Sequence, residues 1–213
     1  MNFTNLIDRI GGAPVFETGL LLAEEIDPFE VRKQLSRWVT AGKIYQLRRG
    51  LYTLAPPYQK VSPHPFLIAN HIQRGSYVSL QSALAYYDLI PERVPLTTSV
   101  TTGRPLLQNT LLGGYQFRHI RLDWFQAYSN IDLGPGQTAC VATPEKALLD
   151  LIYLEPHSDT PAFLQELRLQ HLDRLDLEQL HQLVQNGHKP KLVRAYEEIC
   201  RLTLAERSGY EIL

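Results

Sequence analysis

The chain has 213 residues, of which 44% are hydrophobic and 20% charged, and its formal net charge at pH 7 is −1. This composition excludes long disorder and predicts a globular protein with one large core or, as we favour, two modest ones. No apolar run approaches the roughly 18 residues that span a bilayer, and the N-terminus lacks the pattern of a secretion signal. We therefore expect a cytoplasmic protein, bacterial or archaeal, that does not contact membrane.

Residues 1–27 predict two short helices separated by a short strand. Apolar residues recur at helical spacing over 3–10, residues 13–16 favour a strand, and Thr18 is suited to cap a helix over 19–26. Acidic residues outnumber basic ones here and give this stretch a net charge of −4. We expect Glu24 and Glu25 on the side away from a polyanionic partner.

A stronger helix signal begins at Asp27 and Pro28. The Asp27 side chain can accept the unpaired N–H groups of the first turn, and proline lacks the donor that would go unpaired there. Apolar residues in 31–39 fall on one stripe and predict a buried face, while Gly42 is expected to end the helix in the left-handed conformation. The opposite, exposed face carries Arg32, Lys33, Ser36, Arg37 and Thr40.

Residues 43–55 predict a β-hairpin that turns near Arg48, Arg49 and Gly50. Between residues 28 and 60 seven Lys and Arg residues stand against one Glu, a net charge of +6. Such an excess in a chain of total charge −1 is typical of a surface that binds a phosphate backbone. The alternative is a solvated basic face beside an ordinary sheet.

The order of helix, strand, helix, helix and hairpin is that of a winged helix-turn-helix. In such a module one helix enters the major groove and the hairpin, or wing, reaches backbone or minor groove. We therefore expect double-stranded DNA as the partner, with Tyr45 as a secondary contact. The predicted DNA-binding residues are Arg32, Lys33, Ser36, Arg37, Thr40, Lys43, Arg48 and Arg49.

Prolines crowd residues 56–65 and predict a boundary between two domains, 1–57 and 58–213. Beyond it we expect helices at 66–73, 80–90 and 144–154, with Ser79 and Thr143 as caps. Strands are expected at 77–78, 97–105, 113–122 and 138–143, and a helical tail follows in which Asp176 caps a helix that stops at Gly187. The predicted fold class is α+β: an N-terminal winged helix-turn-helix, then a mixed α/β C-terminal domain with a helical tail.

Enzyme motifs are missing from the sequence. Gly75 and Ser76 are followed by Asp88 without the second carboxylate of a nucleotidyltransferase site, and Glu145 and Lys146 are adjacent rather than spaced as in a nuclease. The histidines and the two cysteines lack metal-ligand spacing. We expect no catalysis, no metal and no cofactor.

Several segments in order resemble the AbiEi-type antitoxins, the transcriptional regulators of type IV toxin–antitoxin systems. These segments are GKIYQLRRGLYTL, YVSLQSALAYYDLI and ATPEKALLDLIY. The resemblance implies a winged helix that binds inverted repeats in its own promoter and represses its operon. It also implies a functional partner, a nucleotidyltransferase-like toxin, that is countered without a stable complex. The implied DNA contacts fall on Arg32, Lys33, Arg37, Arg48 and Arg49.

The resemblance also singles out C-terminal positions whose chemistry the sequence does not explain. For these we favour helix caps and core packing: Ser79, Ser82, Tyr86, Thr143, Pro144, Glu145, Lys146 and Asp150. Two other functions stay open. The C-terminal domain could sense a small molecule, which an apolar pocket with convergent polar groups near 77–87 would favour, or it could bind the toxin directly.

Overall fold

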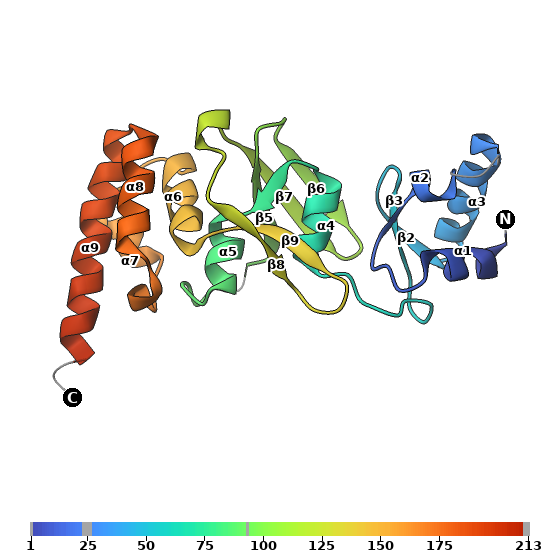
Figure 1. Ribbon diagram of the computed structural model, residues 1–213, viewed down its shortest axis with the longest axis horizontal. Coiled ribbons are helices and arrows are strands. Elements are labelled where there is room, and N and C mark those ends of the chain that lie inside the picture. The colour runs from blue at the N-terminus through green and yellow to red at the C-terminus, as the bar shows by residue number, and fades with distance from the viewer. Residues whose placement is uncertain (1, 23–26, 93, 211–213) are drawn as a thin grey trace.

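The computed structural model describes residues 2–22, 27–92 and 94–210, with 207–210 described by backbone alone. The chain is elongated, with the N-terminal helices and small sheet at one end and the last helix at the other (Figure 1). Helices and two sheets make it an α+β protein, as expected. We call residues 2–54 the N-terminal unit and residues 65–210 the second unit.

The N-terminal unit packs three helices against a three-stranded antiparallel sheet of order β1-β3-β2. Its core is built from apolar residues of all three helices and of the hairpin, among them Leu6, Leu21, Leu35, Trp38 and Ile44, each at most 5% exposed. The elements are α1 (Phe3–Ile10), β1 (Phe16–Glu17), α2 (Thr18–Leu21), α3 (Pro28–Thr40), β2 (Ile44–Arg48) and β3 (Leu51–Leu54).

Local signals set both ends of α3, as predicted. The Asp27 side chain accepts a hydrogen bond from the Phe29 N–H at 2.9 Å. At the other end Gly42 has φ +66°, and its N–H donates to the Val39 carbonyl while the next N–H donates to the Trp38 carbonyl. This pair of bonds is the Schellman arrangement, which requires the left-handed residue that glycine provides.

The first strand and second helix differ in detail from the prediction. The strand lies at Phe16–Glu17 rather than 13–16, because these two residues pair with Tyr52 and Leu51 of the hairpin. Thr18 does not cap α2; its backbone N–H donates to the Gly50 carbonyl at 2.9 Å and so joins α2 to the hairpin turn. The predicted continuation through Glu24 and Glu25 lies outside the described residues.

The second unit is built on a six-stranded mixed sheet of order β6-β7-β5-β4-β9-β8, with β5 parallel to β7 and β4 parallel to β9. The two edge strands, β6 and β8, were not predicted, because most of their side chains are exposed and carry no apolar alternation. The elements are α4 (Pro65–Ile72), β4 (Ser76–Val78), α5 (Leu80–Tyr86), β5 (Leu96–Thr101), β6 (Leu106–Thr110), β7 (Gly113–His119), β8 (Tyr128–Asp132) and β9 (Thr138–Ala142).

Helices cover this sheet on the side away from the N-terminal unit and form the predicted helical tail (Figure 1). Asp176 caps α8 as expected, accepting from the N–H groups of Glu178 and Gln179 at 3.0 Å. Gly187 ends α8, where a Cβ atom would lie 2.5 Å from Leu192. Helix α6 spans Pro144–Leu154, and the tail after it comprises α7 (Pro161–Glu166), α8 (Leu177–Gly187) and α9 (Pro190–Tyr210).

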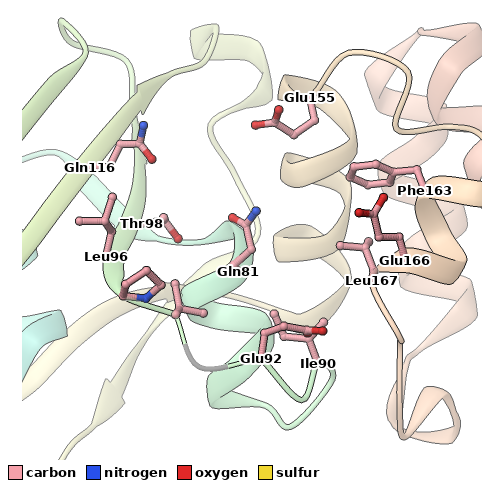
Figure 2. Close-up of a pocket in the computed structure, with 12 residues that line it drawn as sticks. Gln81, Ile90, Glu92, Leu96, Thr98, Gln116, Glu155, Phe163, Glu166 and Leu167 are labelled. Atoms are coloured by element: carbon pink, nitrogen blue, oxygen red, sulfur yellow. The ribbon is translucent and has the colours of Figure 1, made fainter.

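A cavity of about 690 Å³ opens between the sheet, α5 and α7 (Figure 2). It is lined by side chains from α5, β5, β7 and α7, from the segment that follows α5, and from Glu155 at the end of α6. Within the described part of the chain, none of the helices combines the length and apolar character needed to cross a bilayer.

A buried carboxylate, Asp150 on α6, joins that helix to the sheet. Tyr77 and Ser79 donate hydrogen bonds to its Oδ2 at 3.0 and 2.7 Å, and the Trp124 indole donates to Oδ1 at 2.8 Å. Lys146, one turn earlier, forms an ion pair with Oδ1, and both charged side chains are 0% exposed. The carboxylate therefore holds four donors from three segments of the chain at one point of the core.

Burial dominates the electrostatics of this cluster. It raises the pKa of Asp150, while the ion pair with Lys146 and the hydroxyl donors act in the opposite direction. Burial likewise lowers the pKa of Lys146, whose ammonium also lies 4.1 Å from the centroid of the Trp124 ring. Each charge is tolerated only because the other is in place.

The neighbouring segment from Thr143 has capping and packing roles, as favoured from the sequence. The Thr143 hydroxyl accepts the Lys146 N–H at 3.3 Å, and Pro144 occupies the first turn of α6. Glu145 is buried and accepts the Asp176 N–H at 2.9 Å, which joins α6 to the start of α8.

The residues singled out around α5 have similar roles, with one exception. Ser82 exchanges hydrogen bonds with β5, and Tyr86 packs its ring against Phe66 of α4. Ser79 does stand at the N-cap position of α5, but the prediction that its side chain caps the helix is wrong. The hydroxyl donates to Asp150 instead.

We expect Asp150→Ala to lower the free energy of unfolding by about 3–5 kcal/mol, because it leaves the Lys146 charge buried without its partner. Urea titration followed by tryptophan fluorescence measures this loss. The double variant Lys146→Met/Asp150→Leu removes both charges and should lose less, and Asp123→Ala, at a carboxylate 63% exposed, is the matched control. A loss for Asp150→Ala no greater than that of Asp123→Ala would contradict the role assigned to this cluster.

Candidate nucleic-acid interface

One face of α3 presents the predicted polar and basic residues to solvent. The face runs the length of the helix, since its residues are spaced by three and four positions. Lys33 forms a surface ion pair with Glu30 at 3.6 Å, whereas the guanidinium groups of Arg32 and Arg37 have no ion-pair partner among the described residues. All five of its predicted members are exposed: Arg32, Lys33, Ser36, Arg37 and Thr40.

Phe29 belongs to the same face and was missed in the sequence analysis. Its ring is 67% exposed although it is a large apolar side chain, and it lies one turn before Arg32 and Lys33. The signal was available, because Phe29 stands four residues before Lys33 and therefore projects from the same side of the helix. An exposed aromatic beside cations suits contact with base edges or thymine methyl groups better than solvent.

Lys43 and Tyr45 lie at the joint between α3 and the hairpin rather than on the α3 face. The Lys43 ammonium sits 4.8 Å from the centroid of the Phe3 ring, a cation–π contact with α1. Both side chains are half-buried. They are therefore less available to a partner than the α3 residues.

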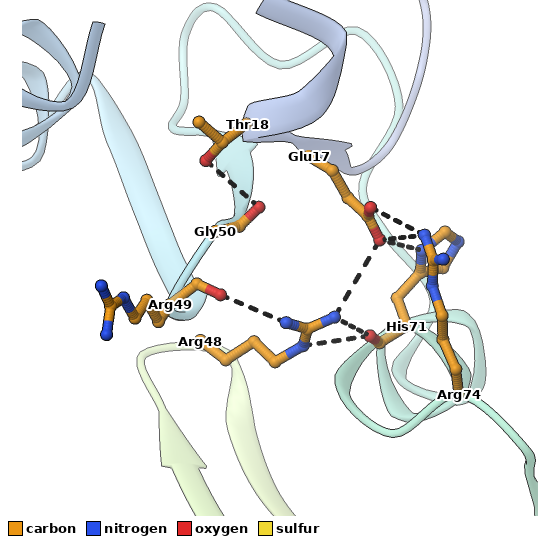
Figure 3. Close-up of polar contacts among 7 residues, drawn as sticks. All are labelled: Glu17, Thr18, Arg48, Arg49, Gly50, His71 and Arg74. Carbon is orange, nitrogen blue, oxygen red and sulfur yellow. Dashed lines mark hydrogen bonds and ion pairs between the residues drawn. The ribbon is translucent and has the colours of Figure 1, made fainter. Parts of the chain in front are cut away.

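The two arginines of the hairpin turn point in different directions (Figure 3). The Arg49 side chain is exposed and directed away from Arg48 and α4. The Arg48 guanidinium instead donates from Nε and Nη2 to the His71 carbonyl of α4, at 3.2 and 3.1 Å. The expected pair of arginines at an open tip is therefore a single exposed arginine, because the last turn of α4 captures the other.

Glu17 completes this contact, which we call the junction: Glu17, Arg48, His71 and Arg74. The Glu17 carboxylate pairs with Arg74 at 2.7 Å and lies 4.0 Å from both Arg48 and His71 (Figure 3). Burial lowers the pKa of His71; Glu17 acts against that shift, and the two arginines add to it. Because His71 is uncharged at neutral pH, it adds no positive charge to those of Arg48 and Arg74 in the junction.

Apolar contacts reinforce the junction. Leu47 and Leu51 of the hairpin, each at most 1% exposed, pack in the same cluster as apolar residues of α4. The Gln108 amide of β6 also donates to the Leu47 carbonyl at 3.3 Å. The hairpin thus rests on the second unit, while α3 lies on the far side of the N-terminal unit (Figure 1).

A metal site or an accessible ionisable site would need suitable side chains among the described residues. They contain no group of three or more His, Cys, Asp or Glu side chains close enough to hold a metal ion. The buried Lys146 and Asp150 are inaccessible to a substrate from solvent. The arrangement on the surface is instead that of a helix face and one loop arginine able to contact a polyanion.

Comparison with known proteins bears on the fold alone. No family model matches the sequence, and no curated protein matches it. Among solved structures, the RV2827C protein from Mycobacterium tuberculosis is similar in fold, with a TM-score of 0.59 and 16% sequence identity. The match covers 94% of this chain and 75% of that chain, so both units take part in the similarity.

We expect Arg48→Ala to loosen the hairpin from α4. The lost hydrogen bonds come from a side chain that is 34% exposed, so the contact between the hairpin and α4 should lose about 1 kcal/mol of stability. This loss corresponds to roughly a fivefold rise in the population of molecules in which the hairpin is detached from α4. Hydrogen exchange read by mass spectrometry should show this rise in β2 and β3. Arg49→Ala removes the same charge from the exposed neighbour and should leave exchange unchanged; equal exchange in the two variants would refute the junction.

Proposed function

We propose that this protein is a DNA-binding transcriptional repressor of its own operon and the antitoxin of a type IV toxin–antitoxin system. Its N-terminal unit is, in this proposal, a winged helix-turn-helix with α3 as the recognition helix and β2–β3 as the wing. The observation that carries the proposal is the exposed α3 face, where Arg32 and Arg37 have no ion-pair partner among the described residues. Unpaired guanidinium groups on a rigid helix are the donors that phosphates and guanine edges accept.

The dimensions and composition of α3 support insertion into the major groove. A helix of 13 residues is about 20 Å long, and the groove is wide enough for one helix. Arg37, Lys33 and Ser36 lie mid-face and toward the C-terminal half, where they would meet base edges and phosphates. Phe29 supplies an apolar contact at the N-terminal end, the end that usually lies deepest in helix-turn-helix complexes.

We assign fewer DNA contacts to the wing than the sequence suggested. Arg49, exposed at the turn, is proposed to contact the phosphate backbone. Arg48 is proposed as a positioning residue, since its guanidinium already bonds the His71 carbonyl. Thr40 and Lys43, near the C-terminal end of α3, are secondary phosphate contacts.

The antitoxin role rests on the resemblance to AbiEi-type proteins. We propose that a nucleotidyltransferase-like toxin is encoded beside this gene. This protein counters the toxin by regulation and not by forming a stable complex with it. Co-expression and affinity purification test this part. Recovery of the toxin through high-salt washes would favour direct binding, and a rise in promoter activity on deletion of this gene supports repression.

We expect Arg37→Ala to weaken binding to a duplex from upstream of its own gene by about 1–3 kcal/mol, if Arg37 contacts a guanine edge. The loss should be larger than for an unrelated duplex, because phosphate contacts carry no sequence information. Fluorescence anisotropy at fixed salt measures both. Arg121→Ala removes an arginine 72% exposed on the second unit and is the matched control; a loss equal to that of Arg121→Ala would remove α3 from the proposal.

Arg49→Ala tests the wing through salt dependence. One phosphate contact contributes about 0.9 to the slope of log affinity against log salt, so the variant should bind all duplexes more weakly and with a slope shallower by about that amount. The slope is obtained from anisotropy titrations over a series of salt concentrations. An unchanged slope would exclude Arg49 from the interface and leave the α3 result intact.

A further inference from the structure

The cavity of about 690 Å³ in the second unit has no part in the proposed DNA contact. Its floor is formed by Leu96 and Thr98 of β5 and Gln116 of β7, and its wall by Phe163 of α7 and Leu167 directly after that helix (Figure 2). A volume of roughly 300–1,000 Å³ with apolar walls is typical of small-molecule sites. The cavity is open to solvent beside α5, near the segment 77–87 where a ligand pocket was the alternative expectation.

Several polar groups that line this cavity lack partners. The side chains of Gln81, Gln116 and Glu166 form no hydrogen bond or ion pair with any described residue, and Figure 2 shows Gln81 and Glu166 on facing walls. Glu155 also lines the cavity but is paired with Arg118 at 2.7 Å. The cavity therefore offers two amides and two carboxylates, those of Glu92 and Glu166, whose hydrogen-bonding capacity is open among the described residues.

The charged side chains among the described residues that line the cavity are all acidic. Its described lining residues include three carboxylates, on Glu92, Glu155 and Glu166, and no Lys, Arg or His. Only Glu155 has a cationic partner among the described residues, so the remaining charge favours a positive ligand. An anionic ligand would be repelled by the carboxylates of Glu92 and Glu166, which have no cationic partner within the described part of the chain.

The carboxylates are spread around the cavity, which distinguishes an organic cation from a metal ion. Among the described residues no three metal-binding side chains converge closely enough to hold a metal. Leu96, Phe163 and Leu167 instead provide an apolar surface that a hydrated metal ion would not use. An aromatic ring beside carboxylates suits an ammonium or guanidinium group on an apolar body.

We propose that this cavity binds a small organic cation, an amine or guanidine with an aliphatic or aromatic body. The cationic head donates to the Glu166 carboxylate and to the amide oxygen of Gln81, while Gln116 lines the far side of the cavity beside Leu96 (Figure 2). The body packs on Leu96 and Phe163. The proposal goes beyond the DNA-binding function and does not rest on it, so each can fail without the other.

Phenethylamine and its neutral isostere 2-phenylethanol test the proposal directly on the full chain. Because a charge-assisted hydrogen bond is lost in the neutral compound, the amine should bind about tenfold more tightly, measured by calorimetry and by ¹H–¹⁵N NMR titration. The amide shifts should cluster at Leu96, Gln116 and Glu166. Equal affinity of the two compounds, no binding of the amine, or shifts elsewhere would overturn the proposal.

Glu166→Gln removes the charge and keeps the shape of the side chain. Since Glu166 is exposed at the edge of the cavity, the variant should fold as the parent does, which its NMR spectrum reports. The variant should weaken phenethylamine binding about tenfold and leave 2-phenylethanol unchanged. Glu197→Gln, at an exposed glutamate of α9, is the matched control; an equal effect of the two substitutions would reduce the binding to general charge attraction and refute the site.

Discussion

The interaction on which the second unit depends is the buried carboxylate of Asp150. It gathers a lysine from its own helix with a tyrosine, a serine and a tryptophan from the sheet and its flanking turn. A charge in this position is stable only when every donor is in place, so the cluster fixes the position of α6 relative to β4. The segment from Thr143 to Asp150 therefore serves the fold, although its charged residues alone could suggest a catalytic site.

The two units are joined by noncovalent contacts as well as by the chain itself. The hairpin packs Leu47 and Leu51 into the apolar cluster of the second unit, and Arg48 bonds the end of α4. Helix α4 in turn packs on β4, β5 and β9 of the large sheet, and β5 forms the floor of the cavity. A continuous set of contacts therefore runs from the hairpin to the cavity. In the proposed regulator, this is the physical connection through which a bound cation could alter the hairpin that α3 packs against.

The site and the fold were predictable to different extents. The exposed face of α3 followed from the spacing of its apolar residues, and Arg32 and Arg37 have no ion-pair partner within the described ranges because they lie on that face. The sequence could not place the Arg48 side chain against α4, because its partner, the His71 carbonyl, lies 23 residues later in the chain. Phe29 was overlooked although helical spacing was sufficient to include it. Strands β6 and β8 carry too few buried side chains to produce a pattern.

The sequence by itself determined the features that depend on near neighbours. These include the Asp27 cap and Gly42 end of α3, the hairpin turn, the Thr143 and Asp176 caps, and the concentration of positive charge in residues 28–60. Only the tertiary structure decided what depends on distant groups: the capture of Arg48 by α4, the use of the Ser79 hydroxyl by Asp150, and the cavity. The physical reason is that caps and turns are satisfied within a few residues, whereas a buried charge or a cavity is defined by segments that meet only in the folded chain.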